Sequence, residues 1–315
     1  LRSLVGSEMC IRDRFNHSLA ALRFARKANG VSELHGHVSR EMWGKYEGIC
    51  PIDHITNAQN WRYWADKQLY KFSEANDDAG FDDRKMYLKK RAFEIVADQT
   101  GKVFDPNVLT IVWARRFAGY KRADFLSWDL ERFEKLLGNL KHPVQIIFAG
   151  KPYPVDYPAI SQFNNLVHLS KNYQNVAVLI GYELGLSKRL KQASDVWLNN
   201  PRVPREASGT SGMTAAMNGA VNFSTDDGWI PEFVSHGHNG FVVPKADYEN
   251  MNTQEQDDYD LEELYKILEN EIVPMYYEKR DTWRSITKNG MNDVRFQFDS
   301  NRMAEEYYEK MYKTS

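Results

Sequence analysis

A glycine-rich stretch at residues 204–219 has the composition of a site that binds an anion or a sugar. It follows a strand-like run at 195–200 and leads into residues 213–217, which favour a helix. The first turn of a helix leaves backbone N–H groups unpaired and carries a partial positive charge. Gly209 and Gly212 let a phosphate or a sugar approach that backbone closely. An anion site at this turn is therefore one interpretation of the stretch.

Glu206 lies just before the turn, where its carboxylate is suited to accept hydrogen bonds from sugar hydroxyls. The alternative is an ordinary strand-to-helix connection in which Ser208 or Thr210 caps the helix. Composition alone does not separate these two interpretations.

A second loop, at residues 115–122, concentrates positive charge around an aromatic side chain. Its cations are Arg115, Arg116, Lys121 and Arg122. Such a cluster is usually a solvated surface, but this one also follows a strand-like run. Arg116 can hold a phosphate with two parallel hydrogen bonds, whereas Lys121 acts as a point charge.

The elements that position both loops are short apolar runs rich in branched residues, separated by helical stretches such as 125–140 and 184–193. The runs are 109–114, 144–149, 176–180, 196–198, 220–223 and 240–243. Runs without strict alternation predict strands buried on both faces, and hence a doubly wound parallel sheet in an α/β domain at 107–246. Ligands of such sheets bind at the carboxyl ends of the strands, where both loops lie.

The remaining chain divides into three parts. Residues 1–14 lack an initiator Met and resemble a translated sequencing adapter, so we exclude them from the fold and expect the chain to be a fragment. Residues 15–106 predict helices, and the charged stretch 68–101 is either a surface helix or a connector between lobes. Residues 247–315 predict acidic helices that pack on the core or on another lobe, with Ser300 capping the last one.

Two smaller features near the N-terminus favour ordinary roles. Residues 15–29 predict a helix that ends at Asn29 and Gly30. His35 and His37 would share a face only in a strand, and they have no carboxylate at ligand spacing. We therefore expect packing or hydrogen bonding there, and no metal.

Composition excludes several classes of protein. A net charge of -2 argues against a general nucleic-acid or anionic-membrane binder, and no apolar run is long enough to span a bilayer. Cys10 and Cys50 form neither a disulfide framework nor a metal motif, which suits a reducing cytoplasm.

In combination, these motifs resemble the α-glucan (glycogen, starch and maltodextrin) phosphorylases, most strongly their shorter bacterial branch. The segments that resemble the C-terminal half of that family are 114–123, 148–151, 195–201, 206–213, 218–219 and 224–229. Residues 29–35 and 55–57 resemble the end of its N-terminal domain. The resemblance covers roughly 15–244 and implies two Rossmann-like lobes of the GT-B type, here with most of the N-terminal lobe missing.

The resemblance also implies a reaction and its partners. The family cleaves a terminal α-1,4-linked glucose from a glucan or maltooligosaccharide with inorganic phosphate, giving glucose 1-phosphate. A homodimer is one assembly that we consider, and the cytoplasmic location that we expect comes from the cysteine usage described above.

Site residues carry over by position. Asn57 resembles a residue that binds the glucose 6-hydroxyl, and Tyr120 one near the 2-hydroxyl. The stretch that binds the 3- and 4-hydroxyls in the family resembles Glu206, Ala207, Ser208 and Gly209 of this chain. Arg116 and Lys121 resemble the groups that hold the substrate phosphate. Gly209 and Thr210 resemble residues whose backbone N–H groups donate near the phosphates, and Tyr182 resembles an aromatic residue beside the cofactor.

One position departs from the family. Where the family has a lysine bound to pyridoxal phosphate as a Schiff base, this chain has Thr214, whose hydroxyl cannot form an imine. Lys121, Lys188 and Lys191 lie elsewhere in the sequence, and none is expected to replace it. Three functions remain open: a phosphorylase with the cofactor held noncovalently or replaced by another phosphate, a nucleotide-sugar-dependent glucan synthase-like transferase, and a catalytically silent glucan-binding homologue. The retained cations and Glu206 argue against the silent homologue.

Overall fold

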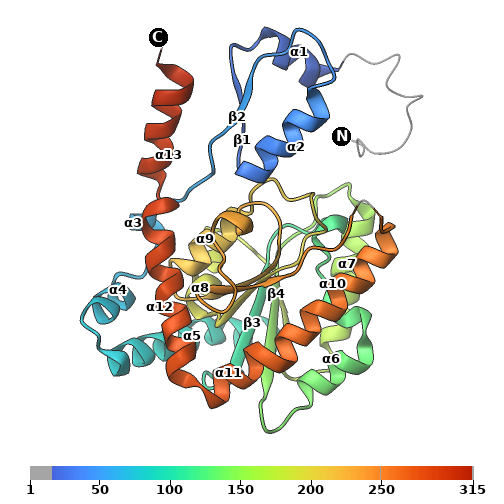
Figure 1. Ribbon diagram of the computed structural model, residues 1–315. Helices are drawn as coiled ribbons and strands as arrows, with labels where there is room; N and C mark the ends of the chain where they lie inside the picture. The colour runs from blue at the N-terminus through green and yellow to red at the C-terminus, as the bar shows by residue number, and fades with distance from the viewer. Residues whose placement is uncertain (1–15, 249, 314–315) are drawn as a thin grey trace.

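The computed structural model describes residues 16–248 and 250–313, which form a parallel sheet with helices on both faces (Figure 1). The segment interpreted as adapter-derived, 1–14, and Cys10 within it lie outside the described residues. A smaller N-terminal segment sits at one end of the sheet.

The sheet has six strands in the order β5-β4-β3-β6-β7-β8, and every neighbouring pair is parallel. The strands are β3 (Leu109–Ala114), β4 (Val144–Ala149), β5 (Val176–Leu179), β6 (Val196–Asn199), β7 (Val221–Thr225) and β8 (Gly240–Val243). All six predicted strands are confirmed, as is the parallel α/β sheet. The order reverses between β3 and β6, which places the loops after these two strands at the usual ligand site of such a fold.

In β3, β4, β5 and β6, alternate side chains face two different hydrophobic layers, whereas β7 and β8 contribute only to the first. On β3, Ile111 and Trp113 face one layer while Val112 and Ala114 face the other. The first layer contains residues of α6 (Leu130–Leu137), α7 (Tyr157–Ser170), α10 (Thr253–Ile267), α11 (Val273–Glu278) and α12 (Arg280–Gln297). The second contains residues of α5 (Asp78–Thr100), α8 (Leu184–Ala193) and α9 (Thr210–Ala216). Burial on both faces explains why the strands read as continuous apolar runs.

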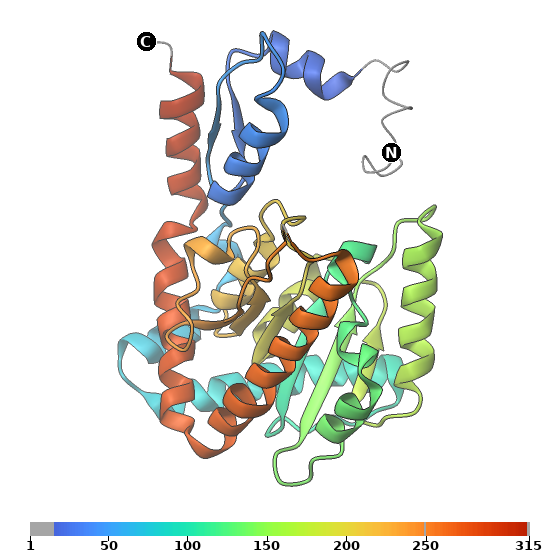
Figure 2. The same cartoon turned by 45° about the vertical axis from the view of Figure 1, so that its right-hand side comes forward.

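The N-terminal segment lies beside the last helix, α13 (Ser300–Tyr307), in both views (Figures 1 and 2). Its elements are α1 (His17–Phe24), β1 (Ala28–Gly30), α2 (Glu33–Trp43) and β2 (Ile52–His54), with α3 (Trp61–Trp64) and α4 (Lys67–Glu74) leading to α5. Arg302 donates from Nη2 to the Thr56 carbonyl at 2.9 Å, and the Gln59 amide donates to the Phe298 carbonyl at 2.9 Å. The C-terminal helices thus return the chain to its N-terminal segment.

Several helices differ from the sequence predictions in their bounds or caps. The helix predicted at 15–29 ends at Phe24, because Ala28–Gly30 pairs with β2 as a strand. A 3-10 turn takes the first part of the helix predicted at 125–140, and α6 ends at Leu137. The sequence did not predict α2, which holds His35 and His37. Asp299, and not Ser300, caps α13 by accepting from the Asn301 amide at 2.9 Å. Two π-helical segments, Leu268–Ile272 and Tyr308–Tyr312, complete the tail.

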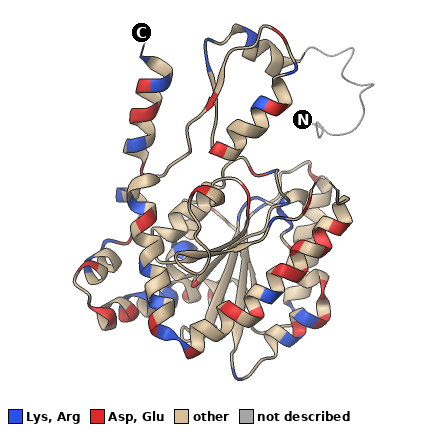
Figure 3. Ribbon diagram, viewed as in Figure 1, with Lys and Arg blue, Asp and Glu red and all other residues tan. Residues whose placement is uncertain are grey.

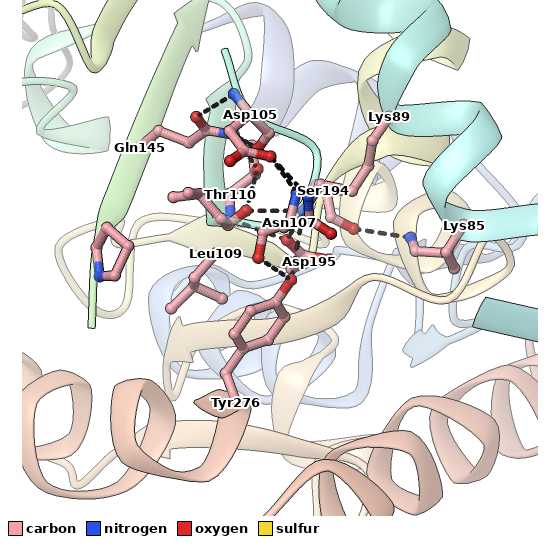
Figure 4. Close-up of polar contacts among 12 residues, drawn as sticks. Lys85, Lys89, Asp105, Asn107, Leu109, Thr110, Gln145, Ser194, Asp195 and Tyr276 are labelled. Carbon is pink, nitrogen blue, oxygen red and sulfur yellow. Dashed lines mark hydrogen bonds and ion pairs between the residues drawn. The ribbon is translucent and has the colours of Figure 1, made fainter. Parts of the chain in front are cut away.

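Buried charges tie the long helix α5 to the amino-terminal side of the sheet (Figure 4). Lys89 forms an ion pair with Asp195, which also accepts from the Thr110 amide. Lys85 donates to the backbone carbonyls of Gln192, Ser194 and Asn218. Each ammonium is therefore satisfied, as burial of a charge requires.

Candidate active site

The two loops selected from the sequence meet at the reversal of strand order. Lys121, in the loop after β3, places Nζ 2.5 Å from Oε2 of Glu206, in the loop after β6. Arg115 brings Nη2 to 3.3 Å from the same oxygen. One carboxylate is therefore held by two cations, all three largely buried.

A second loop fixes the shape of the backbone around Glu206. The Glu206 amide donates to Oδ2 of Asp227 at 2.8 Å, and the Trp229 amide donates to the Ser208 carbonyl at 2.9 Å. Gly228 has a φ of +63°, and a Cβ added there would lie 2.3 Å from the Ser208 carbonyl oxygen. Only glycine fits at this close approach of the two backbones. The 227–229 turn therefore fixes the backbone conformation of the Glu206 loop through these two hydrogen bonds.

Burial shifts the protonation of the charged groups. Desolvation, followed by the neighbouring Arg115, lowers the pKa of Lys121 to about 8, although Glu206 opposes the shift. Burial raises the pKa of Asp227 to about 7, against the backbone N–H groups that favour its charged form. The pKa of Tyr120 is raised by burial and then by Glu206. Groups tuned in this way cluster at functional sites.

The cation cluster contains one exposed arginine and one that is buried in ion pairs. Arg116 is exposed and, within residues 16–248 and 250–313, has no carboxylate within ion-pair distance. Arg122 is fully buried and donates to Asp257 at 2.8 Å and Asp260 at 2.7 Å, both on α10. Figure 3 shows how acidic residues gather along α10. Arg116 therefore remains available to an anion, whereas the ion pairs of Arg122 hold the loop after β3 against α10.

Arg115 is a site residue that the sequence reasoning did not single out. Its Nε and Nη1 are buried without a hydrogen-bond partner among the described residues, although Nη2 approaches Glu206. Such unpaired donors match the oxygens of a bound phosphate. Its position directly after a buried strand was the available signal. Asp227 was also missed, because its role depends on backbone contacts.

The glycine-rich turn leads into a helix, but α9 begins at Thr210 and not at Met213 as predicted, and it has no side-chain cap. Gly209, at a φ of +89°, is the N-cap of α9, so neither Ser208 nor Thr210 caps the helix. Ser208 Oγ is buried with no hydrogen-bond partner in the described chain, and Thr210 is the first residue of α9. The carbonyl of Ala207 accepts from Ser32 Oγ at 2.7 Å, which attaches the N-terminal segment to the loop.

The N-terminal segment forms one wall of a cavity beside Glu206, with a volume of about 370 Å³. Leu34, His35, Val38 and Met42 of α2 face Pro204, Arg205, Glu206, Ala207 and Asp227 across it. Asn57 is not among these lining residues. The backbone N–H of Asn57 donates to the Val31 carbonyl. The hydroxyl of its neighbour Thr56 donates to Oε2 of Glu232 at 2.6 Å. Tyr120, by contrast, lies in the Arg115–Lys121 loop close to Glu206.

Two positions implied by the family lie around α8 and α9. Tyr182 donates to the Ala114 carbonyl at 3.0 Å, which places it next to Arg115 at the end of β3. Thr214 is buried on α9 and donates from Oγ1 to the Ser211 carbonyl at 3.0 Å. The threonine is therefore part of the helix packing and offers no amine.

The described part of the chain offers neither a metal-ligand cluster nor a membrane-spanning helix. No group of three or more His, Cys, Asp or Glu residues there could hold a metal ion. His35 instead accepts from the Val31 amide through Nδ1 at 3.1 Å. None of the described helices combines the length and apolarity needed to cross a bilayer.

Comparison with known proteins identifies the family. The carbohydrate phosphorylase family model matches residues 14–270. The "Uncharacterized protein MJ1631" of Methanocaldococcus jannaschii is 42% identical over 300 residues, covering 95% of this chain and 56% of that protein. The maltodextrin phosphorylase of Thermococcus litoralis is 33% identical, over 95% of this chain and 41% of its own length. The glycogen phosphorylase of Aquifex aeolicus is 32% identical, over 95% and 49% respectively. The chain thus spans about half the length of these relatives, and it belongs to the carbohydrate phosphorylase family.

Proposed function

We propose that this chain is the C-terminal catalytic part of an α-glucan phosphorylase that transfers a terminal α-1,4-linked glucose to phosphate, giving glucose 1-phosphate. The observation that carries the proposal is the Glu206 carboxylate held by Arg115 and Lys121 at the sheet reversal. In this assignment, 15–106 is the end of an N-terminal lobe with its connector helices, 107–246 is the catalytic lobe, and 247–315 forms C-terminal helices.

Phosphate is assigned to the cations of the loop after β3. Arg116 is exposed without a carboxylate, and Arg115 has two unpaired buried donors. Lys121, whose pKa lies at about 8, releases Glu206 when an anion takes its place beside the ammonium. Binding of the dianion and freeing of Glu206 are thereby linked, and the preorganised cations hold the negatively charged phosphate in position for the transfer.

Sugar recognition is assigned to the freed carboxylate and its neighbours. Glu206 accepts hydrogen bonds from the 3- and 4-hydroxyls, with the backbone of Ala207, Ser208 and Gly209 beside it. Tyr120 lies by the 2-hydroxyl. Asn57 is assigned to the 6-hydroxyl on family position alone, since its side chain is not among the lining of the Glu206 cavity.

The residues present fit pyridoxal phosphate in part. The unpaired Arg115 donors and the left-handed Gly209 turn suit its phosphate, with Thr210 and Tyr182 alongside, while Thr214 cannot bind it covalently. When bound, the cofactor supplies a phosphate that serves as acid and base. This chain's residues hold that phosphate and orient the substrates.

The test uses the full-length parent, because the chain covers only part of its relatives and we expect it to be inactive alone. The parent is incubated with maltooligosaccharide and inorganic phosphate, with and without pyridoxal phosphate, and glucose 1-phosphate is assayed. Product release supports phosphorolysis, and its dependence on the added cofactor shows whether the cofactor works without the family's lysine. Absence of product in both conditions would refute the proposal and favour a nucleotide-sugar-dependent synthase-like transferase, or a silent glucan-binding homologue if nucleotide sugars also fail.

A further inference from the structure

Lys191, on α8, is a buried lysine without a polar partner. Its side chain is 4% exposed, and its Nζ lies 3.9 Å from the ring centroid of Trp64 and 5.9 Å from that of Trp197. Among the described residues, no hydrogen bond and no carboxylate within ion-pair distance accompanies this nitrogen. An aromatic face is therefore the main partner of its charged form.

The other strongly buried lysines are all satisfied. Lys85 donates to three carbonyls, Lys89 pairs with Asp195, and Lys121 pairs with Glu206. Since an unpaired buried charge is costly, Lys191 stands out as a side chain whose position the packing does not explain.

The residues around the amine are hydrogen-bonded to α9 or to Asn218 just after it, and α9 carries the position where the family's lysine is missing. The side-chain amide of Asn218 donates from Nδ2 to the carbonyls of both Trp64, at 3.0 Å, and Thr214, at 2.8 Å. Trp197 donates from Nε1 to Ser211 Oγ, one turn before Thr214, at 3.4 Å. The backbone of Trp64 and the ring of Trp197 are thus both linked to α9, the first through Asn218 and the second directly.

Burial also prepares the amine for reaction. Desolvation lowers the pKa of Lys191 to about 7, so about half of the molecules carry the neutral, nucleophilic amine at pH 7. An ordinary exposed lysine is neutral in only about one molecule in two thousand at that pH. Lysines activated by desolvation are those that form imines with carbonyl compounds.

We propose that Lys191 replaces the missing lysine at Thr214 as the amine that binds the aldehyde of pyridoxal phosphate, an assignment that rests on the proposed function. The Lys191 nitrogen forms a bond to the aldehyde carbon, and the carbonyl oxygen leaves as water with both amine protons. The product is an imine, and no oxidant or reductant is consumed. Trp64, whose ring the ammonium contacts in the free protein, would offer an aromatic surface to the bound ligand. This assignment revises the expectation from the sequence that no other lysine substitutes.

The test is reductive trapping followed by peptide mapping. The full-length parent is incubated with pyridoxal phosphate at pH 7, reduced with borohydride, digested, and analysed by mass spectrometry. We expect the reduced adduct on Lys191 at about tenfold or more above any exposed lysine, because of its larger neutral fraction. Lys188 is the matched internal control, since it lies one turn earlier on α8 and its ammonium donates to the Tyr63 carbonyl.

Two variants keep the result interpretable. Lys191→Met preserves an unbranched side chain of similar length and should lose the adduct, whereas Lys188→Met should keep it; circular dichroism and a urea melt verify that both fold. The inference is overturned if the labelling of Lys191 is no greater than that of Lys188. It is also overturned if pyridoxal phosphate stays bound through dialysis but is released unchanged after reduction, because no imine was then present to be reduced. Neither readout needs turnover, so a parent that is labelled at Lys191 without producing glucose 1-phosphate would contradict the proposed function and leave this inference standing.

Discussion

Replacing Lys191 by methionine should stabilise the protein at pH 7, and the gain should shrink as pH rises. Lys191 is 4% exposed and has a pKa of about 7 in the folded chain, whereas an unfolded lysine titrates near 10.5. Between these values the unfolded chain binds the proton that the folded chain has lost. Wild-type stability therefore rises with pH in this window, since the state that binds fewer protons is favoured as protons become scarce.

The magnitude follows from the width of the window. Each pH unit in which only the unfolded chain is protonated is worth about 1.4 kcal/mol. From pH 7, where folded Lys191 is half protonated, to pH 9, the wild type should gain about 2 kcal/mol relative to Lys191→Met. Below pH 7 both states carry the proton, so the advantage of methionine should be constant there.

The measurement is urea unfolding of both proteins at pH 6, 7, 8 and 9, with the free energy of unfolding extrapolated to water. Lys188→Met is the control, because Lys188 donates to a carbonyl near the surface and should show no such pH-dependent difference. A Lys191→Met protein that is less stable than the wild type at every pH, by a constant amount, would show that Lys191 has a stabilising polar partner and refute the reasoning.

Three further predictions concern the candidate active site and its supports. Arg116→Ala in the full-length parent should abolish phosphorolysis while glucan binding persists, because Arg116 is assigned to phosphate; near-normal turnover would contradict this. Gly228→Ala should cost about 2 kcal/mol in urea unfolding and weaken glucan binding, because a Cβ would lie 2.3 Å from the Ser208 carbonyl. Arg122→Met should lower the free energy of unfolding by about 3 kcal/mol or more, since it leaves the buried Asp260 carboxylate without its cation. The loss should be smaller at pH 5, because burial raises the pKa of Asp260 and the carboxylate takes up a proton more readily there.

The parallel sheet could be predicted from the sequence because strands buried on both faces must be apolar throughout. The runs at 109–114, 144–149 and 240–243 match β3, β4 and β8 in their bounds. Helix limits were less certain where a tertiary contact decided them. β1 exists because Ala28–Gly30 pairs with β2, and no local pattern shows that pairing.

Residue types and loop positions in the sequence determined that Glu206, Lys121 and Arg116 belong to one site. Loops that follow strands of a parallel sheet meet at one edge, so this conclusion needs no coordinates. The division of labour within the cation cluster was decided only by the tertiary structure, which buries Arg122 against α10 and leaves Arg116 exposed. Lys191 shows the same limit, because its lowered pKa comes from burial by residues that include Trp64, which lies far away in the sequence. Sequence identifies which groups can ionise, whereas burial and partners, which the fold supplies, decide what each group does.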